Sequence, residues 1–399
     1  MATLNPFRAV RPRPDVAARV AAVPYDVVTA DEARQLAADE PLSFLHVSRA
    51  EIDLPAGVDP YSEAVYGRAI RNYDALKESA LVVDDRPGVY VYRLAMGRHV
   101  QTGIAAAFSV DEYDRNVIKK HERTRRDKED DRTRHMIALG AQTGPVFLTY
   151  RAAGDVDRIV ATETAAPPLF DFEAPDGVRH TIWRATAAGC DGLAGAFRLI
   201  PALYIADGHH RAASAARARQ TLQGDRGTTM LGVAFPHDQV QILPYNRVVK
   251  DLGALSADDF LAAVREGFLV EPGPAVPRAR GTIAMHVAGA WHSIRPRVPP
   301  EASDPIGSLD VSVLQDQVLA PILKIADVRT DKRIDFVGGA RGTGALETLV
   351  SSGKAAVAFS LYPVSVADLM RVSDAGDIMP PKSTWFEPKL RDGLLINPL

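Results

Sequence analysis

The chain has 399 residues, of which 46% are hydrophobic and 24% charged, and its formal net charge is −3. This balance is typical of a globular protein, and the length predicts two or three domains. The slight acidity argues against a dedicated nucleic-acid-binding protein, which usually carries a basic excess. With one cysteine, Cys190, the chain can form neither an intramolecular disulfide nor a thiolate metal cluster.

No apolar run approaches the roughly 20 residues that are needed to span a bilayer. The first residues, MATLNPFRAVRPRPD, also lack the continuous apolar stretch of a secretory signal. We therefore expect a cytoplasmic protein without a membrane partner.

The first half of the chain predicts a mixture of helices and hairpins. Thr29, with Glu32 three residues later, forms a capping box that predicts a short helix. Residues 61–81 have the apolar spacing of an amphipathic helix, and residues 88–110 indicate a β-hairpin that turns near Gly97. Further short strands are predicted at residues 144–150 and 202–207.

The second half predicts the same mixture of elements. Its predicted helices span residues 256–268, 311–325 and 343–353, and its strands span 230–236, 241–249 and 355–364, with a hairpin at 281–296. Helices and strands follow no regular βαβ order, which favours an α+β fold over a doubly wound parallel sheet. We expect a mixed-sheet nucleotide-binding core over residues 1–250 and a further α+β region over residues 251–399.

The stretch YIADGHHRAASAARARQ (204–220) concentrates polar residues between a predicted strand and an alanine-rich helix. The first turn of a helix has backbone N–H groups without intrahelical partners and a partial positive charge, so it stabilises anions. Gly208 would let a ligand approach the backbone closely. His209, His210 and Arg211 supply directional donors, and Arg211 could grip a phosphate with two nitrogens.

Asp207 does not suit a simple anion site, because its carboxylate would repel a phosphate. It fits if it holds a metal, orients a histidine or accepts a proton from a hydroxyl. A structural alternative is that Asp207 caps the helix and that local hydrogen bonds satisfy the histidines. We interpret this junction as a phosphate site with a carboxylate beside it.

Residues 115–135 form a second charged segment, with nine Lys/Arg, five Asp/Glu and two His. Such a run is usually a solvated helix face supported by pairs such as Asp130–Arg134. Because it follows a predicted strand, its start could be anchored at a sheet edge. Lys119, Lys120, His121 and Glu122 stand together, and they could neutralise a polyphosphate while Glu122 acts as a base or metal ligand. A nucleic-acid contact is the other alternative.

Smaller candidates lie elsewhere in the chain, each with a structural alternative. They are Asp26 after a proline turn, His46, Arg49 and Glu51 at a predicted strand end, Lys332 and Arg333 in a glycine-rich turn, and Lys382, Ser383 and Thr384 near the C-terminus. For the last group we favour the structural alternative, in which Trp385 and Phe386 dock the tail on the core.

The segment IADGHHRAASA resembles the signature of the ParB/sulfiredoxin superfamily, and within it the free-serine kinases of the SerK type. Along most of its length the chain also resembles a bacterial family described as a domain of unknown function. The segments that carry this second resemblance are NPFRAVRP, AAVPYDVV, PLSFLHVSRAEIDLP, KKHERTRRDKEDDRTRH, YIADGHHRAASA and MPPKSTWFEPKLRDGLL. Sulfiredoxins need a cysteine where His209 or His210 stands here, and no helix-turn-helix like that of the partition proteins follows residue 220.

The resemblance implies a phosphotransferase that uses ATP or ADP, with CTP as a further option and Mg²⁺ as the companion ion. In that scheme Gly208, His209, His210, Arg211 and His121 bind the phosphates, and Lys119 or Lys120 stabilises the transferred group. The catalytic candidates are Asp207, Glu122 and His210. Free serine is the substrate that the resemblance implies.

Two alternatives stay open at this point. One is a nucleotide-binding switch of the ParB type without a small-molecule substrate. The other is a nuclease that uses the basic segment 115–135, although the acidity of the chain argues against it. A homodimer is compatible with either.

Overall fold

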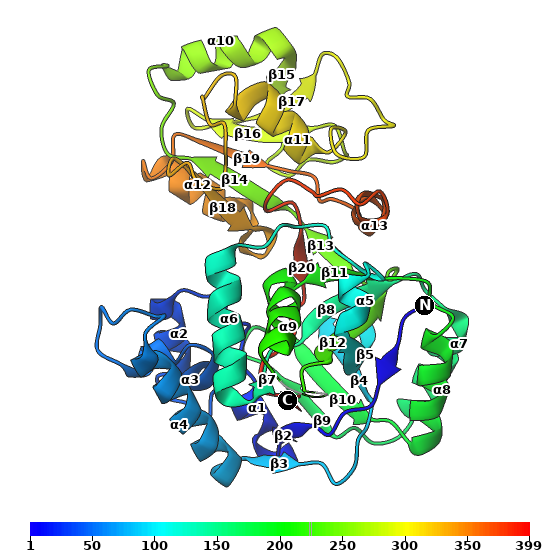
Figure 1. Cartoon of the computed structure of the whole chain (residues 1–399). Coiled ribbons are helices and arrows are strands. Elements are labelled where there is room, and N and C mark those ends of the chain that lie inside the picture. Colours follow the sequence, from blue (N-terminus) through cyan, green and yellow to red (C-terminus); the bar gives the residue numbers. More distant parts are fainter. Residues whose placement is uncertain (223, 225) are drawn as a thin grey trace. The chain divides into compact units, whose positions relative to one another are not determined.

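The computed structural model describes residues 1–222, 224 and 226–399, and the chain divides into two compact units (Figure 1). The first unit comprises Met1–Lys120, Thr124–Val240 and Pro388–Leu399, and the second comprises His121–Arg123 and Gln241–Glu387. The C-terminal segment therefore returns to the first unit after the second has been built. The functional assignment of residues 1–250 and 251–399 stays a prediction.

The first unit is built on a nine-stranded sheet in which parallel and antiparallel pairs mix. The strand order is β6-β11-β8-β12-β5-β4-β10-β9, with β1 also paired to β5. The bounds are β1 Leu4–Asn5, β4 Tyr90–Met96, β5 His99–Ser109, β6 Ile118–Lys119, β8 Val146–Tyr150, β9 Phe170–Glu173, β10 Arg179–Arg184, β11 Leu203–Asp207 and β12 Thr229–Pro236. This arrangement confirms the predicted α+β class.

Nine helices belong to the described part of the first unit. They are α1 Ala17–Val20, α2 Ala30–Ala37, α3 Leu45–Ser48, α4 Glu63–Ser79, α5 Val110–Asp114, α6 Arg126–Leu139, α7 Gly154–Glu163, α8 Ala187–Phe197 and α9 His209–Thr221. One core cluster joins α7, α8 and α9 to the sheet, and another joins α1 to α4. The alanine-rich face of α9 allows this helix to pack closely on the strands, which fixes the position of its first turn.

The C-terminal segment runs through the second core cluster of the first unit. The N–H of Ile396 donates to Val10 O, and the Val10 N–H donates back to Ile396 O. Beyond it, β21 (Asn397–Pro398) pairs with β7 (Ala141–Gln142), and β2 (Val10–Pro12) pairs with β3 (Leu81–Val83). The segment is thus part of the core of this unit, not a loose tail.

The second unit contains an antiparallel six-stranded sheet, in the order β15-β17-β16-β19-β14-β18. Its strands are β14 Tyr245–Val249, β15 Phe268–Pro272, β16 Ile283–Val287, β17 Ala290–Pro296, β18 Ile334–Gly338 and β19 Val357–Ser360, and a separate pair joins β13 Gln241–Leu243 to β20 Trp385–Glu387. Its helices are α10 Ala257–Gly267, α11 Asp310–Leu314, α12 Gly342–Ser351 and α13 Val366–Asp374. The pairing of β20 confirms that Trp385 and Phe386 dock the tail.

Most local predictions are confirmed. The Thr29–Glu32 capping box is formed at the start of α2, and the β4–β5 hairpin turns at Gly97 with a φ of +59°. The start of the charged segment lies on the edge strand β6, as expected. The predicted Asp130–Arg134 pair is wrong, because Arg134 pairs with Glu63 of α4 and Asp130 pairs with Arg217 of α9.

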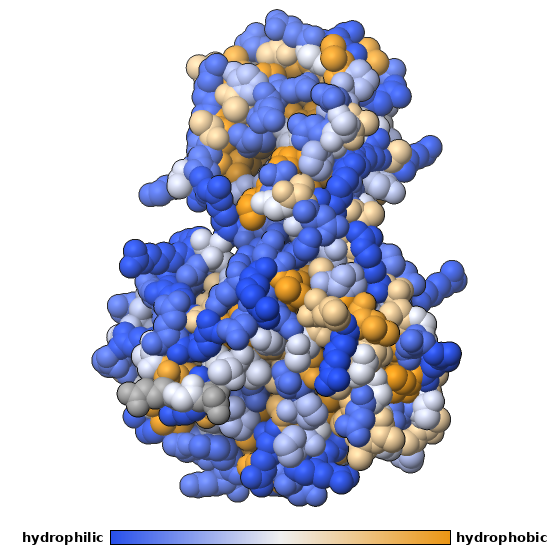
Figure 2. Space-filling view, turned by 45° about the vertical axis from the view of Figure 1, so that its right-hand side comes forward, coloured by the Kyte–Doolittle hydropathy of each residue, from blue (hydrophilic) through white to orange (hydrophobic). Residues whose placement is uncertain are grey.

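On the face shown in Figure 2, hydrophilic residues predominate and apolar residues are scattered among them. None of the described helices combines the length and the apolar character that a membrane crossing requires.

We expect Ile396→Ala to destabilise the first unit by about 2–5 kcal/mol, because Ile396 is fully buried and its loss leaves a cavity. Leu199→Ala is the matched control, since Leu199 is 74% exposed and its loss should change stability by less than about 0.5 kcal/mol. Urea denaturation followed by circular dichroism measures both. Equal stability of the two variants would show that the C-terminal segment is not part of this core.

Candidate functional site

The centre of the predicted site is the turn between β11 and α9. Gly208 occupies the N-cap position of α9 with a φ of +89°, a conformation that favours glycine. Because glycine has no side chain, the helix start lacks the side-chain oxygen that Ser, Thr or Asp would place at this position. The helix then runs for 13 residues from His209, so its partial positive charge points at this turn.

Asp207, the last residue of β11, is held by two hydrogen bonds. Its Oδ1 accepts the Gly208 N–H at 2.9 Å, and its Oδ2 accepts from Lys389 Nζ at 2.9 Å. Burial favours the neutral form, but the charges of Lys389 and Arg211 outweigh it and hold the pKa of Asp207 below its usual range. Lys389 therefore neutralises the Asp207 carboxylate, which would otherwise repel an anion at the turn.

The two histidines at the turn have different surroundings. His209 is buried, with 6% of its surface exposed, whereas His210 is half-buried. His210 Nε2 accepts the backbone N–H of Arg125 at 3.0 Å. His210 thus ties the residues that precede α6 to the start of α9.

Arg211 points into the interior of the first unit. It is 7% exposed, and its Nη1 donates to Pro145 O. Its Nη2 lies 3.5 Å from Oδ2 of Asp26. Burial opposes its charge, but the carboxylates of Asp26 and Asp207 outweigh this effect and raise the pKa of Arg211. The structure therefore brings Asp26 together with Arg211, while a grip by Arg211 on a phosphate at the turn stays a prediction.

Two glycines make room for this buried guanidinium. A Cβ on Gly208 would lie 3.2 Å from Arg211 Cζ, and a Cβ on Gly144 would lie 3.3 Å from Arg211 Cδ. Both distances are shorter than most Cβ contacts, so larger residues at either position would displace the side chain.

Lys119 and Lys120 lie on and just after the edge strand next to β11. Lys119 pairs in parallel register with Tyr204, and its Nζ is 5.9 Å from the centre of that ring. Lys120 Nζ lies 3.9 Å from the ring centre of Tyr113, and burial lowers the pKa of Lys120. The Lys119 ammonium therefore borders the strand that leads into the turn, whereas the Lys120 ammonium lies against α5 (Val110–Asp114).

His121 and Glu122 fall in the short segment that groups with the second unit. There His121 O accepts the Met379 N–H at 2.8 Å, and His121 Nε2 lies 3.3 Å from Thr384 Oγ1. The prediction that His121 and Glu122 serve the phosphate site stays a prediction.

The smaller candidates are mostly engaged in structural contacts. His46 lies on helix α3, not at a strand end, and its Nδ1 is 2.7 Å from Asp53 Oδ1. Arg49 and Glu51 form an ion pair of 2.7 Å. In the second unit, Arg333 pairs with Asp331, Lys332 O accepts from Lys250, and Ser383 Oγ donates to Pro380 O.

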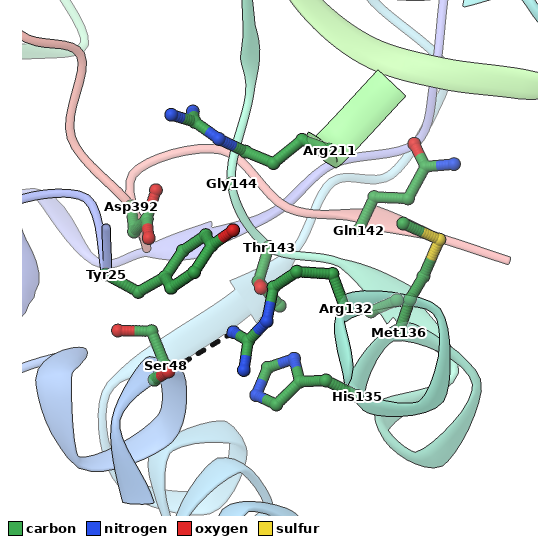
Figure 3. A pocket seen from close by; sticks show the side chains of 11 residues that line it. Tyr25, Ser48, Arg132, His135, Met136, Gln142, Thr143, Gly144, Arg211 and Asp392 are labelled. Atoms are coloured by element: carbon green, nitrogen blue, oxygen red, sulfur yellow. Dashed lines mark hydrogen bonds between the residues drawn. The ribbon is translucent and has the colours of Figure 1, made fainter. Parts of the chain in front are cut away.

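A pocket of about 40 Å³ lies behind the turn, within the first unit (Figure 3). Figure 3 shows the ring of Tyr25 between the side chains of Arg211 and Arg132. The guanidinium of Arg132 lies 4.2 Å from the centre of that ring and 2.7 Å from Asp131 Oδ2. The full lining is Tyr25, Ser48, Arg132, His135, Met136, Ala141, Gln142, Thr143, Gly144, Arg211 and Asp392.

Asp392 brings the C-terminal segment to this pocket. It is 2% exposed, and its backbone pairs with Ala22. Burial raises the pKa of Asp392 to about 7, although the positive charge of Arg211 opposes this rise. Sequence reasoning missed Asp392, Lys389 and Tyr25 as site residues, and the only signal for them was that they fall in segments already noted for their resemblance.

Residues 4–312 match the protein family described as "Protein of unknown function (DUF1015)". The chain belongs to the DUF1015 family. This membership confirms the resemblance over most of the chain, whereas the ParB/sulfiredoxin resemblance stays a prediction that rests on the IADGHHRAASA segment. No curated protein matches this DUF1015 sequence significantly.

Several solved structures are similar to this DUF1015 chain at low sequence identity. A free serine kinase in complex with AMP is 13% identical, with a TM-score of 0.38, over 73% of this chain and 92% of the kinase. SbnI from Staphylococcus aureus, with a C-terminal truncation, is 13% identical with a TM-score of 0.40, over 73% and 87%. A conserved hypothetical protein from Pyrococcus furiosus is 13% identical with a TM-score of 0.38, over 74% and 95%.

The stability of the first unit should depend on the protonation of His135 in the pocket wall. Burial and the nearby Arg132 lower the pKa of His135 to about 4, against an ordinary value of about 6.5. Its neutral form therefore contributes stability that is complete above about pH 6.5 and is lost, by about 3 kcal/mol in all, as the pH falls to about 4.

His135→Gln keeps a donor for Val47 O, the partner of His135 Nε2 at 3.0 Å, but it does not titrate. Its free energy of unfolding in urea should thus fall less than that of the wild type between pH 6.5 and pH 4. If the free energy of unfolding fell equally with pH in both proteins, His135 would not be the source of the pH dependence.

Proposed function

We propose that this protein is a nucleotide-dependent phosphotransferase that acts on a small hydroxyl compound, and that the start of α9 binds the phosphates of the donor. The observation that carries the proposal is the left-handed Gly208 between β11 and a 13-residue helix. This backbone arrangement directs the positive end of α9 at the turn without a capping side chain in the way. Lys119 on the neighbouring strand and Lys389 beside Asp207 add positive charge.

Lys389 and Asp207 have complementary roles in this proposal. An incoming phosphate competes with Asp207 for the ammonium group of Lys389, so the pair can open when the donor binds. Asp207 then becomes available to accept the proton of the acceptor hydroxyl or to ligate a Mg²⁺ that accompanies the donor. Phosphoryl transfer needs mainly positioning and neutralisation of charge, which this set of residues supplies.

The remaining assignments follow the resemblance of the motif. ATP or ADP is the proposed donor, with CTP as an option, and free serine is the first acceptor to test. Glu122 and His121 are proposed as a second carboxylate and a further phosphate ligand. The second candidate function is a nucleotide-binding switch, which the same Gly208–α9 turn would serve equally well.

His210→Ala should weaken the binding of ATP or ADP by about tenfold or more, since a hydrogen bond to a charged group contributes about 1.5–3 kcal/mol. The free energy of unfolding should fall by only about 1 kcal/mol, the contribution of its bond to the Arg125 N–H. Isothermal titration calorimetry measures the affinity. His99→Ala, at the β4–β5 turn, is the control and should bind like the wild type. Unchanged affinity in His210→Ala would contradict a phosphate site at the turn.

Incubation with ATP, ADP or CTP, Mg²⁺ and L-serine or other small hydroxyl compounds tests the reaction. A phosphotransferase forms phosphorylated acceptor in step with loss of the donor, as ³¹P NMR would show. Tight nucleotide binding with slow hydrolysis and no phosphorylated acceptor would favour the switch.

A further inference from the structure

The pocket behind the turn leaves buried polar atoms without hydrogen-bond partners in the described part of the chain. These atoms are Nε and Nη2 of Arg211, Oγ of Ser48 and Oδ1 of Asp392. The three residues are 7%, 3% and 2% exposed, and all three line the pocket. Buried polar groups in folded proteins nearly always have a partner, so this cluster indicates a bound ligand.

The donors that Arg211 leaves unused have a specific geometry. Its Nη1 is bound to Pro145 O, so the remaining pair is Nε and Nη2, which lie along one edge of the planar guanidinium. This edge matches the two oxygens of a carboxylate or a phosphate. Asp26 approaches only Nη2, at 3.5 Å, and leaves Nε unused.

The charge of the pocket distinguishes between these two anions. A cavity of about 40 Å³ has room for about three water molecules, so its size excludes a nucleotide. Asp392 and Asp26 stand close to Arg211 and contribute to its pKa, so a doubly charged phosphate would meet two carboxyl groups. A ligand with a singly charged carboxylate and a hydrogen-bond donor would accept from Arg211 and donate to Asp392.

We propose that this pocket binds a small carboxylate whose adjacent carbon carries a hydroxyl or amino group. Arg211 holds the carboxylate with Nε and Nη2, Asp392 Oδ1 accepts from the hydroxyl or amino group, and Ser48 Oγ donates to the second lone pair of a carboxylate oxygen. The proposal rests on the proposed function, because it defines the class of acceptor. Arg211 belongs to the first turn of α9, so the acceptor lies next to the turn that receives the donor.

Calorimetry on the full-length protein without nucleotide tests this, with glycolate, L-serine, acetate and inorganic phosphate as probes. Glycolate or L-serine should bind saturably and at least tenfold more tightly than acetate, which lacks the donor group. Inorganic phosphate should bind more weakly still. Arg211→Lys removes the paired Nε and Nη2 donors, so it should weaken the binding of glycolate or L-serine by about tenfold or more.

Ser48→Ala gives the sharpest comparison, because Ser48 Oγ has no partner among the described residues. The melting temperature of the free protein should stay the same or rise, while the affinity for the carboxylate falls by about threefold to tenfold. Ser214→Ala is the matched control, since Ser214 is also buried but its Oγ donates to Glu129 O. That control should melt earlier and keep its affinity.

Three other outcomes overturn the proposal that the pocket binds a small carboxylate. If the wild type binds nucleotide but none of the carboxylates, the pocket holds only water and the proposed function stands without it. If phosphate binds as tightly as glycolate and depends on Arg211, the pocket is a phosphate site. If Ser48→Ala keeps full affinity, the ligand does not occupy this pocket. Carboxylate binding without any nucleotide binding would support the pocket and overturn the phosphotransferase.

Discussion

The buried guanidinium of Arg211 is the feature on which the rest of the site depends. A charge with 7% exposure is stable only if opposite charges and acceptors surround it, and breaking such a set is strongly destabilising. Here the surroundings come from four separate stretches of chain: Asp26, the Pro145 carbonyl, Asp207 and Asp392. Because these stretches meet at one group, Arg211 fixes the geometry of both the turn in front of it and the pocket behind it.

This arrangement explains why glycine stands at two positions of the site. Gly208 meets two requirements at once, since it adopts a left-handed conformation and it lies against the guanidinium face. Gly144 meets a different requirement, because a Cβ there would lie 2.9 Å from Asp392 Oδ1 and 3.3 Å from Arg211 Cδ. A side chain at either position would displace Arg211 and would therefore disturb the start of α9 as well as the pocket.

The sequence predicted those features whose causes are local. The capping box at Thr29, the hairpin turn at Gly97 and the junction at Gly208 depend on a few neighbouring residues, and the structure contains all three. Helix α8 was missed because its sequence, AAGCDGLAGAF, holds three glycines, each unfavourable in a helix by about 1 kcal/mol. Its glycines let it approach α7: a Cβ on Gly189 would lie 2.2 Å from Glu163 Oε1. Only tertiary packing makes that helix stable.

Tertiary packing also decides which ion pairs form in the charged segment 115–135. The charged segment predicted an Asp130–Arg134 pair along one helix, but Asp130 pairs across helices with Arg217, while Asp131 pairs with the adjacent Arg132. Helix α6 packs on α9, where Ser214 Oγ donates to Glu129 O and Arg217 pairs with Glu129 as well as Asp130, so the partner of each carboxylate depends on tertiary packing. Charge pattern alone therefore predicts that a segment is ionic, but not which groups it holds.

The contacts of the C-terminal segment depend most strongly on tertiary packing. Lys389 pairs with Asp207 across 182 positions of sequence, and Asp392 reaches the pocket beside Tyr25. Neither contact has a local signal, because both arise only when the segment docks between Ala22 and the core around Val10. Before docking, Asp207 lacks its Lys389 partner and the pocket lacks one wall. The charge balance at the turn and the closure of the pocket therefore form together with the last segment of the chain, so the site is complete only in the fully folded first unit.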